Sequence, residues 1–189
     1  MEQNSKEYIR LAADLQSDSI VDGPGLRTVI WTQGCPHNCF GCHNPSTHDF
    51  SGGALISIDY IKSQIDELVF QKGITFSGGD PMCQPEACYE IAKYAISKGL
   101  NIWCYTGYTF EQLIELGKKR KGIMDFLSCI DVLVDGKFMM ELKSLDCKYR
   151  GSTNQRLVDV KKSLSEGTVC LVPENTGVIH FKKSSHLYV

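Results

Sequence analysis

The sequence lacks any run of about 18 consecutive apolar residues, the length that a membrane-spanning helix requires. Its N-terminal stretch is polar and charged, and contains no apolar segment of the kind that forms a secretory signal. We therefore expect a cytoplasmic protein that has no membrane partner.

An excess of charge of either sign is also missing. The 20 Lys and Arg residues nearly balance the 22 Asp and Glu residues, which leaves a net charge of −2. No overall field then attracts nucleic acid, so we expect no nucleic-acid partner. The chain shows neither a sequence repeat nor a low-complexity segment. With 189 residues and 42% hydrophobic content it can bury one substantial core, and a single domain is the simplest organisation.

The cysteines do not form the even-numbered, widely spaced set of a disulfide framework. There are nine, and three of them fall within eight residues, at Cys35, Cys39 and Cys42. In a reducing cytosol such a group indicates a metal site or a catalytic site. The other six show no second tight spacing, and we expect buried or incidental thiols at Cys83, Cys88, Cys104, Cys129, Cys147 and Cys170.

The segment that carries the three grouped thiols is rich in turn formers, which suits a tight loop around a metal. Soft thiolate ligands select zinc, copper(I) or iron–sulfur clusters. A [4Fe-4S] cluster normally takes four cysteines, so three would leave one iron open to another ligand. The alternative is a zinc site that one of the nearby histidines, His37, His43 or His48, would complete.

The hydrophobic pattern predicts strands that alternate with helices. Apolar, β-branched runs predict strands at residues 28–32, 74–77, 100–105 and 130–134. The segment 8–15 could be an edge strand or a short turn. Strands that alternate with helices imply right-handed crossovers and a parallel sheet.

Three helices are predicted between these strands, each from a start signal. Ser57 is a suitable N-cap for a helix whose apolar face would carry Ile58, Ile61, Ile65, Leu68 and Val69. Pro85 suits the first turn of a second helix, with an apolar stripe of Ala87, Cys88, Ile91, Ala92, Ala95 and Ile96 that stops at Gly99. Thr109 and Gln112 form a capping box for the third.

Four distinctive motifs follow directly after predicted strands, at residues 35–42, 78–80, 106–108 and 135–137. In a parallel α/β sheet the carboxyl ends of the strands share one edge, where ligands bind. A single site therefore accounts for all four motifs.

The three-cysteine loop, followed by Gly78-Gly79-Asp80-Pro81, resembles the radical S-adenosylmethionine (SAM) enzymes. The chain is most similar to one branch, the activating enzymes of glycyl-radical enzymes, and within it to those that activate anaerobic ribonucleoside-triphosphate reductase. The motifs that carry the resemblance are VDGPG (21–25), QGC (33–35), CHNP (42–45), SGGDP (77–81), YTGY (105–108), VDGKF (134–138) and RGSTNQ (150–155).

The resemblance implies an α/β fold, a partial (β/α) barrel of the radical SAM type with parallel strands. A full eight-unit barrel typically needs about 250 residues, so this chain should leave an open flank that could admit a loop from another protein. We expect one radical SAM domain over residues 1–189, with its core at about 21–172 and a C-terminal tail at 173–189.

The resemblance also implies two cofactors, a [4Fe-4S] cluster held by Cys35, Cys39 and Cys42, and SAM chelated to the open iron. One electron would cleave SAM to methionine and a 5′-deoxyadenosyl radical. The implied substrate is a glycine Cα–H in anaerobic ribonucleoside-triphosphate reductase, and the implied electron donor is a flavodoxin-like protein. The alternatives are activation of another glycyl-radical enzyme, such as pyruvate formate-lyase, and a zinc-stabilised binding module without chemistry.

The SAM-binding residues that the resemblance implies are Gly41, Cys42, His43, Gly78, Gly79, Asp80, Thr106, Asp135 and Lys137. Gly41 stands where the wider family often has an aromatic residue, so His43 or the Gly41 backbone is the candidate adenine contact. Relatives with an acidic residue in place of Tyr105 hold a monovalent cation nearby, and we expect none here.

Simpler readings of several segments remain open. The paired glycines could be a strand-ending turn, and Lys137 could lie in a solvated turn. The polar segment 150–156 could be an ordinary surface loop or lie near SAM or the partner. The basic run 118–121 is expected to be a solvated helix end, with docking of an acidic electron donor as the minor alternative.

Overall fold

The structure, a computed structural model, describes residues 6–173, and the predicted tail at 173–189 lies almost wholly outside them. The strands are β1 (Tyr8–Leu11), β2 (Gln16–Ser19), β3 (Arg27–Thr32), β4 (Ala54–Ser57), β5 (Gly73–Gly78), β6 (Asn101–Tyr105), β7 (Val132–Asp135) and β8 (Arg156–Asp159). The helices are α1 (Ile58–Asp66), α2 (Pro85–Ser97), α3 (Phe110–Gly117), α4 (Lys121–Cys129) and α5 (Val160–Glu166). Short 3-10 helices are η2 (Pro45–Thr47), η3 (Pro81–Cys83) and η4 (Met140–Leu142).

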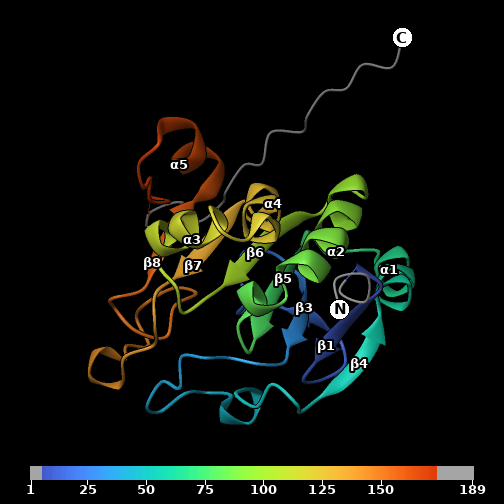
Figure 1. Cartoon of the computed structure of the whole chain (residues 1–189), viewed down its shortest axis with the longest axis horizontal. Coiled ribbons are helices and arrows are strands. Elements are labelled where there is room, and N and C mark those ends of the chain that lie inside the picture. The colour runs from blue at the N-terminus through green and yellow to red at the C-terminus, as the bar shows by residue number, and fades with distance from the viewer. Residues whose placement is uncertain (1–5, 174–189) are drawn as a thin grey trace.

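All eight strands form one mixed sheet in the order β4-β1-β3-β5-β6-β7-β8, and β2 pairs with β3 off this path. Its central strands β3, β5, β6 and β7 are parallel, which confirms the four predicted strands and their direction. Figure 1 shows α2 and α4 in front of these strands. The described part of the chain is thus an α/β fold around a parallel centre.

The prediction of a parallel sheet is confirmed for the four central strands, while the strands at both edges of the sheet pair antiparallel. β1 and β2 pair antiparallel with β3, β4 pairs antiparallel with β1, and β8 pairs antiparallel with β7. Only the short 3-10 helix η4, and no α-helix, lies between β7 and β8, so that connection need not be a crossover. These strands are four residues long, and β2 reads Gln-Ser-Asp-Ser, so hydrophobic periodicity carries little signal for them.

The three predicted helices are confirmed together with their start signals. The Ser57 hydroxyl accepts from the Asp59 amide at the start of α1, and the capping box of Thr109 and Gln112 opens α3. Two predicted apolar-face residues are exposed instead. Val69 is 76% exposed because α1 already ends at Asp66, and Ile96 is 43% exposed.

The basic run 118–121 is not simply a solvated helix end, since it connects α3 to the unpredicted helix α4. Arg120 binds both carboxylate oxygens of Glu86 at 2.9 and 2.5 Å. Lys121 is the first residue of α4. Helix α5 was not predicted either.

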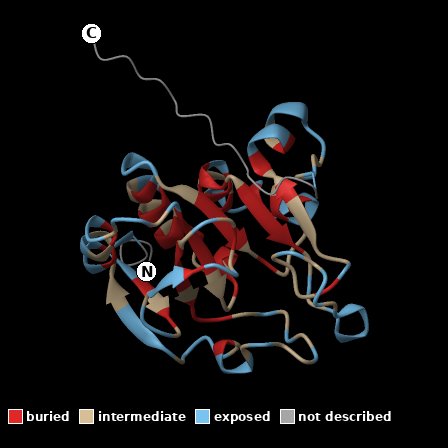
Figure 2. Cartoon of the chain, turned by 180° about the vertical axis from the view of Figure 1, so that it is seen from behind, coloured by how far each residue is buried: buried red, intermediate tan, exposed pale blue. Residues whose placement is uncertain are grey.

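The main core lies between the sheet and helices α1 to α4, and its buried residues are red in Figure 2. Its largest members include Phe76, Phe126 and Leu113, and each such side chain contributes about 1.5–3 kcal/mol on burial. A smaller cluster on the opposite side of the sheet contains Trp103, Val132 and Val134. The sheet is therefore anchored on both faces.

Arg27 explains the position of the VDGPG motif. Its buried guanidinium donates to the Thr75 hydroxyl at 2.6 Å, to the Ile74 carbonyl at 2.7 Å and to Asn101 at 2.7 Å. It also donates to the Pro24 carbonyl at 3.4 Å, and burial lowers the pKa of Arg27 to about 10. This side chain ties the motif to three neighbouring strands.

Candidate active site

The carboxyl ends of the four parallel strands bring the predicted motifs to one edge of the sheet. The segment after β3, residues 34–48, is called the cluster loop below. It lies beside the long segment after β7, residues 136–155, and Figure 1 shows the two segments as light blue and orange traces at the lower left. The Asp80 amide, just after β5, donates to the Gly34 carbonyl at 2.8 Å.

The cluster loop is closed by its own backbone. The Gly34 amide donates to Thr47 at 2.9 Å, and the Cys35 amide donates to His48 at 3.3 Å. Gly34 and Gly41 have φ angles of +95° and +72°, a conformation that glycine adopts without strain. The loop therefore turns back on itself and presents its three thiols from one short segment.

Cys35, Cys39 and Cys42 are all half-buried free thiols. Burial raises the pKa of Cys35 to about 11, and a backbone hydrogen bond from His37 opposes the shift. Burial likewise raises the pKa of Cys39, against a backbone hydrogen bond from Phe138. The Asn44 amide donates to Cys42 Sγ at 3.4 Å. Each thiol thus has a backbone amide directed at it.

Asp80 is fully buried and accepts from three separate segments. The donors are the Met82 amide at 2.9 Å, the Thr106 hydroxyl at 2.9 and 3.0 Å, the Gly107 amide at 3.0 Å and His37 Nε2 at 2.6 Å. The structure therefore places Asp80 and Thr106 together, with the carboxylate directed into the protein. It joins the cluster loop to the ends of β5 and β6.

His37 was predicted only as a possible zinc ligand, and its bond to Asp80 was missed. Its ring meets Tyr108 edge-on, with centroids 4.5 Å apart. A Cβ added at Gly107 would lie 2.3 Å from the ring, so only glycine leaves room there. The two bonded residues are 43 positions apart, and nothing local in the sequence connects them.

Gly78 and Gly79 do more than end a strand. Gly78 has a φ of +100°, and a Cβ there would lie 2.6 Å from the Thr32 carbonyl oxygen. A Cβ at Gly79 would lie 2.4 Å from the Gly34 carbonyl oxygen. The cluster loop therefore packs directly on the backbone of this motif.

Asp135, the last residue of β7, is buried and bound on two sides. It accepts from the Phe110 amide at 2.8 Å and from Arg156 at 2.9 and 2.5 Å. Arg156 also pairs with Glu111, and this hydrogen bond holds the pKa of Glu111 at about 2. Lys137, two residues on, is exposed.

Gly41 and His43 lie against the segment after β7. A Cβ at Gly41 would meet the terminal methyl of Met140 at 2.6 Å, and the ring of His43 lies 5.0 Å from that of Phe138. Both predicted adenine contacts are thus on the side of the cluster loop that faces this segment.

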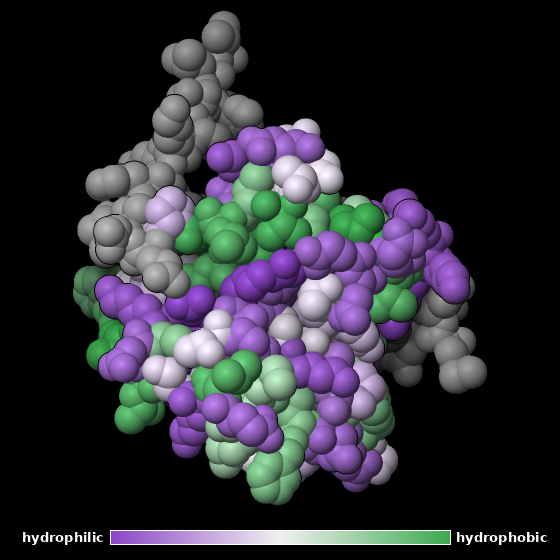
Figure 3. All heavy atoms as spheres, turned by 90° about the vertical axis from the view of Figure 1, so that its left-hand side faces the viewer, coloured by the Kyte–Doolittle hydropathy of each residue, from purple (hydrophilic) through white to green (hydrophobic). Residues whose placement is uncertain are grey.

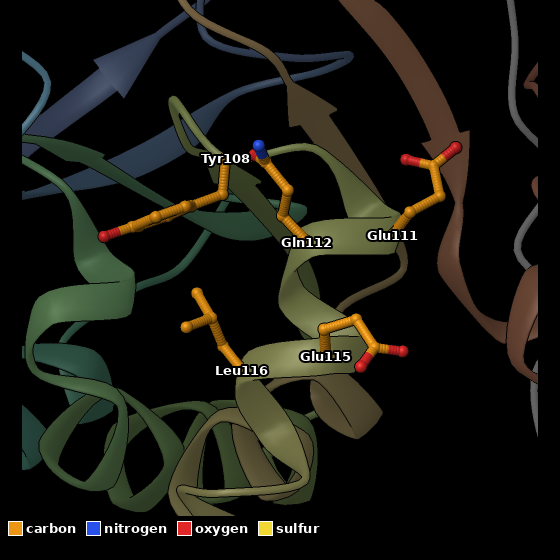
Figure 4. Close-up of a pocket in the computed structure, with 5 residues that line it drawn as sticks. All are labelled: Tyr108, Glu111, Gln112, Glu115 and Leu116. Carbon is orange, nitrogen blue, oxygen red and sulfur yellow. The ribbon is translucent and has the colours of Figure 1, made fainter.

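An apolar hollow of about 450 Å³ lies beside the site, along α3. Figure 4 shows Tyr108 and Leu116 on opposite sides of it, with the carboxylates of Glu111 and Glu115 turned away. A second hollow of about 270 Å³ includes Cys83 and Arg120 in its lining. No helix within residues 6–173 has the length and apolar character needed to cross a membrane.

Comparisons with known proteins identify the family. A family model described as "4Fe-4S single cluster domain" matches residues 21–158. Over 145 residues the chain is 36% identical to the anaerobic ribonucleoside-triphosphate reductase-activating protein of Escherichia coli K12, covering 72% of this chain and 90% of that protein. The chain belongs to this family of reductase-activating proteins.

Two more distant similarities accompany this match. The pyruvate formate-lyase-activating enzyme of Clostridium pasteurianum is 30% identical over 146 residues, covering 62% of this chain and 61% of that enzyme. Among solved structures, QueE from Escherichia coli matches 54% of this chain and 53% of its own, with 14% identity and a TM-score of 0.46.

The donor set suits the [4Fe-4S] cluster of this activating-protein family. Within residues 6–173 no group of three His, Cys, Asp or Glu side chains is arranged around a single metal ion. In a [4Fe-4S] cluster, however, each thiolate binds a different iron, so the thiols need not meet at one point. Backbone amides directed at the sulfurs are also the hydrogen bonds that tune such clusters.

Contact between the Gly-Gly motif and the cluster loop gives a testable prediction. Gly79→Ala is expected to displace the cluster loop, because the new methyl would overlap the Gly34 carbonyl. The free energy of unfolding should fall by about 1–3 kcal/mol. Iron and sulfide content after anaerobic reconstitution should fall well below that of the wild type.

The matched control is Gly99→Ala. Gly99 has a φ of +80° and nothing within 4 Å of an added Cβ, so this change costs about 1–2 kcal/mol without touching the loop. It should keep full iron content. A Gly79→Ala protein with wild-type iron content would contradict the prediction.

Proposed function

We propose that this protein activates anaerobic ribonucleoside-triphosphate reductase, using a [4Fe-4S] cluster and SAM to form a glycyl radical on the reductase. One observation carries the proposal. Three half-buried thiols of one loop lie on the same sheet edge as the Gly-Gly-Asp motif and the Asp135–Lys137 turn, in a chain 36% identical to such an activating protein.

We assign Cys35, Cys39 and Cys42 as the three cluster ligands. When bound, the cluster and SAM supply a one-electron cleavage to methionine and a 5′-deoxyadenosyl radical, which takes a hydrogen atom from glycine Cα. The protein's task is to orient SAM and to keep other hydrogen donors away from the radical.

The SAM-binding residues are proposed at the same edge of the sheet. Backbone groups of Gly78 and Gly79 can approach SAM closely because they carry no side chain. Gly41 and His43 are the proposed adenine contacts, and the exposed Lys137 is proposed to bind the carboxylate of SAM. Asp80, Thr106 and Asp135 are buried, so we propose that they act by holding these neighbours in place.

The setting of the reaction follows from the same features. We propose one radical SAM domain whose sheet is an incomplete barrel, with an open side for the glycine-bearing loop of the reductase. Nine free thiols suit the reducing cytoplasm. A flavodoxin-like protein is the proposed electron donor.

An exposed apolar surface supports a large protein partner. Phe40, in the cluster loop, is 81% exposed, and Leu145 is 95% exposed. The segment that contacts the cluster loop also carries Met139, Met140 and Leu142, which are 44%, 40% and 38% exposed. Figure 3 shows apolar residues gathered above the middle of the β8 and α5 side of the molecule, with smaller apolar groups among polar ones below them. Large exposed apolar side chains beside a functional site favour contact with another protein.

The test is glycyl radical formation on purified candidate partners. The reconstituted protein, SAM and a reductant are mixed anaerobically with either the reductase or pyruvate formate-lyase, and each mixture is examined by EPR. An oxygen-sensitive glycyl signal on the reductase alone is the expected result. A signal on pyruvate formate-lyase alone would transfer the assignment to that enzyme, which the 30% identical relative makes the second candidate. Stoichiometric zinc and no 5′-deoxyadenosine would overturn both.

The electron donor is tested in the same mixture. Reduced flavodoxin in place of dithionite should sustain radical formation. If dithionite works and flavodoxin does not, the proposed donor is wrong while the proposed activity stands.

A further inference from the structure

The segment 150–156 binds the turn after β7 residue by residue. Asn154 Nδ2 donates to the Lys137 carbonyl at 2.8 Å, and Gln155 Nε2 donates to the Gly136 carbonyl at 3.0 Å. Arg156 pairs with the Asp135 carboxylate at 2.9 and 2.5 Å. These two residues also face each other where β7 ends and β8 begins. Three consecutive side chains therefore hold three consecutive residues of the turn.

The segment 150–156 is itself held in shape. Gln155 Oε1 accepts from the amides of Gly151 at 2.8 Å and Ser152 at 3.2 Å. The Arg150 guanidinium donates to the Gln155 carbonyl at 3.1 Å. Gln155 thus uses one end of its amide to shape the segment and the other to hold the turn.

The same segment continues along the chain after the turn. The Ser152 hydroxyl accepts from the Met139 amide at 3.2 Å, and the Thr153 amide donates to the Leu142 carbonyl at 2.9 Å. Ser152 is fully buried. This is not an ordinary surface loop, because it supplies hydrogen bonds along most of residues 135–142.

The other side of residues 137–140 touches the cluster loop. The Phe138 backbone and the charge of Lys137 both oppose the rise that burial causes in the pKa of Cys39. The Phe138 ring lies 5.0 Å from His43, and Met140 covers Gly41. Displacing the turn would therefore disturb the contacts that residues 137–140 make beside Cys39 and Cys42.

We propose that residues 151–156 are a positioning element that fixes the turn Asp135–Lys137 and, through Phe138, the geometry of the cluster loop. None of the three turn-binding side chains needs to touch SAM for this. The inference rests on the proposed function for its effect on SAM, and on the contacts alone for its effect on the loop.

The test uses Gln155→Glu and a structurally matched control, Gln71→Glu. The first change keeps an acceptor for the Gly151 and Ser152 amides but sets a carboxylate oxygen against the Gly136 carbonyl. Gln71 lies just before the start of β5, away from the edge that carries the motifs. Its side-chain amide likewise accepts from two backbone amides and donates to another residue. Its Oε1 accepts from the Val69 and Phe70 amides at 3.1 Å each, and its Nε2 donates to Asp18 at 2.7 Å.

The first measurement is amide hydrogen exchange of the metal-free protein. Gln155→Glu is expected to speed exchange about tenfold both in residues 135–142 and in the cluster loop, 34–48. Gln71→Glu should change neither. Faster exchange in 135–142 with an unchanged cluster loop would overturn the proposal, and so would no change in either segment.

The second measurement follows the SAM-induced change in the EPR spectrum of the reduced cluster. Gln155→Glu should raise the SAM concentration for half-maximal change about 10- to 100-fold, the usual effect of losing a supporting contact. Asn154→Ala, which removes a single hydrogen bond at a more exposed position, should give a smaller shift in the same direction. Unshifted affinity in both variants overturns the positioning role.

These readouts separate this inference from the proposed function. If the wild-type protein failed to cleave SAM, the function would be wrong, yet hydrogen exchange would still decide whether the segment positions the loop.

Discussion

Replacing Cys39 with Ala is expected to reduce 5′-deoxyadenosine formation to background, because the cluster would lose one of its three protein ligands. The same result is expected for Cys35→Ala and Cys42→Ala. Each variant is reconstituted with iron and sulfide under anaerobic conditions, and deoxyadenosine is measured in the same tube after addition of SAM and dithionite. The wild type should hold about four irons and four sulfides per chain.

Cys170→Ala is the control for loss of a thiol. Cys170 is also a half-buried free cysteine, but its thiol contacts Glu166, at the end of α5. This variant should keep wild-type iron content and wild-type deoxyadenosine formation. Full activity in any one of the three cluster-loop variants would contradict the ligand assignment.

Asp80→Ala is expected to lower the free energy of unfolding by about 3–5 kcal/mol. The substitution would leave several buried donors without an acceptor. They are the Thr106 hydroxyl, the amides of Met82 and Gly107, and His37. Each unsatisfied buried donor costs about 1–3 kcal/mol before relaxation. The measurement is urea denaturation of the metal-free protein under reducing conditions, with unfolding monitored by circular dichroism.

Asp49→Ala provides the comparison. Its exposed carboxylate also accepts from a backbone amide and a hydroxyl, both of Ser51, but water can replace it there. The free energy of unfolding is expected to fall by less than about 1 kcal/mol. If Asp80→Ala were as stable as Asp49→Ala, the buried carboxylate would not hold the three segments together, and a direct SAM contact would become its main role.

The elements around the site were largely predictable because their signals are local. The β-branched runs predicted the four central strands, and Ser57, Pro85 and the capping box of Thr109 predicted the helix starts. The spacing of the three cysteines predicted a soft metal site without reference to any partner. Each of these features is encoded within a few consecutive residues.

The edge strands and α4 were not predictable in the same way. β2 is polar, and β8 is only four residues long and follows a long segment without an α-helix, so neither strand shows a sustained alternation of apolar and polar residues. Helix α4 begins with Lys121 and has no N-cap side chain, so its start carries no signal. Packing against α2, and of the Phe126 ring against Phe76 of β5, stabilises it instead.

The sequence by itself determined the chemistry, because thiol spacing, turn glycines and strand patterns are properties of short segments. Only the tertiary structure decided the connections between them. It directed Asp80 toward His37 and Thr106 rather than outward, and it set residues 154–156 against residues 135–137. Such bonds join groups far apart along the chain, so they form only when the sheet brings the ends of its strands to one edge.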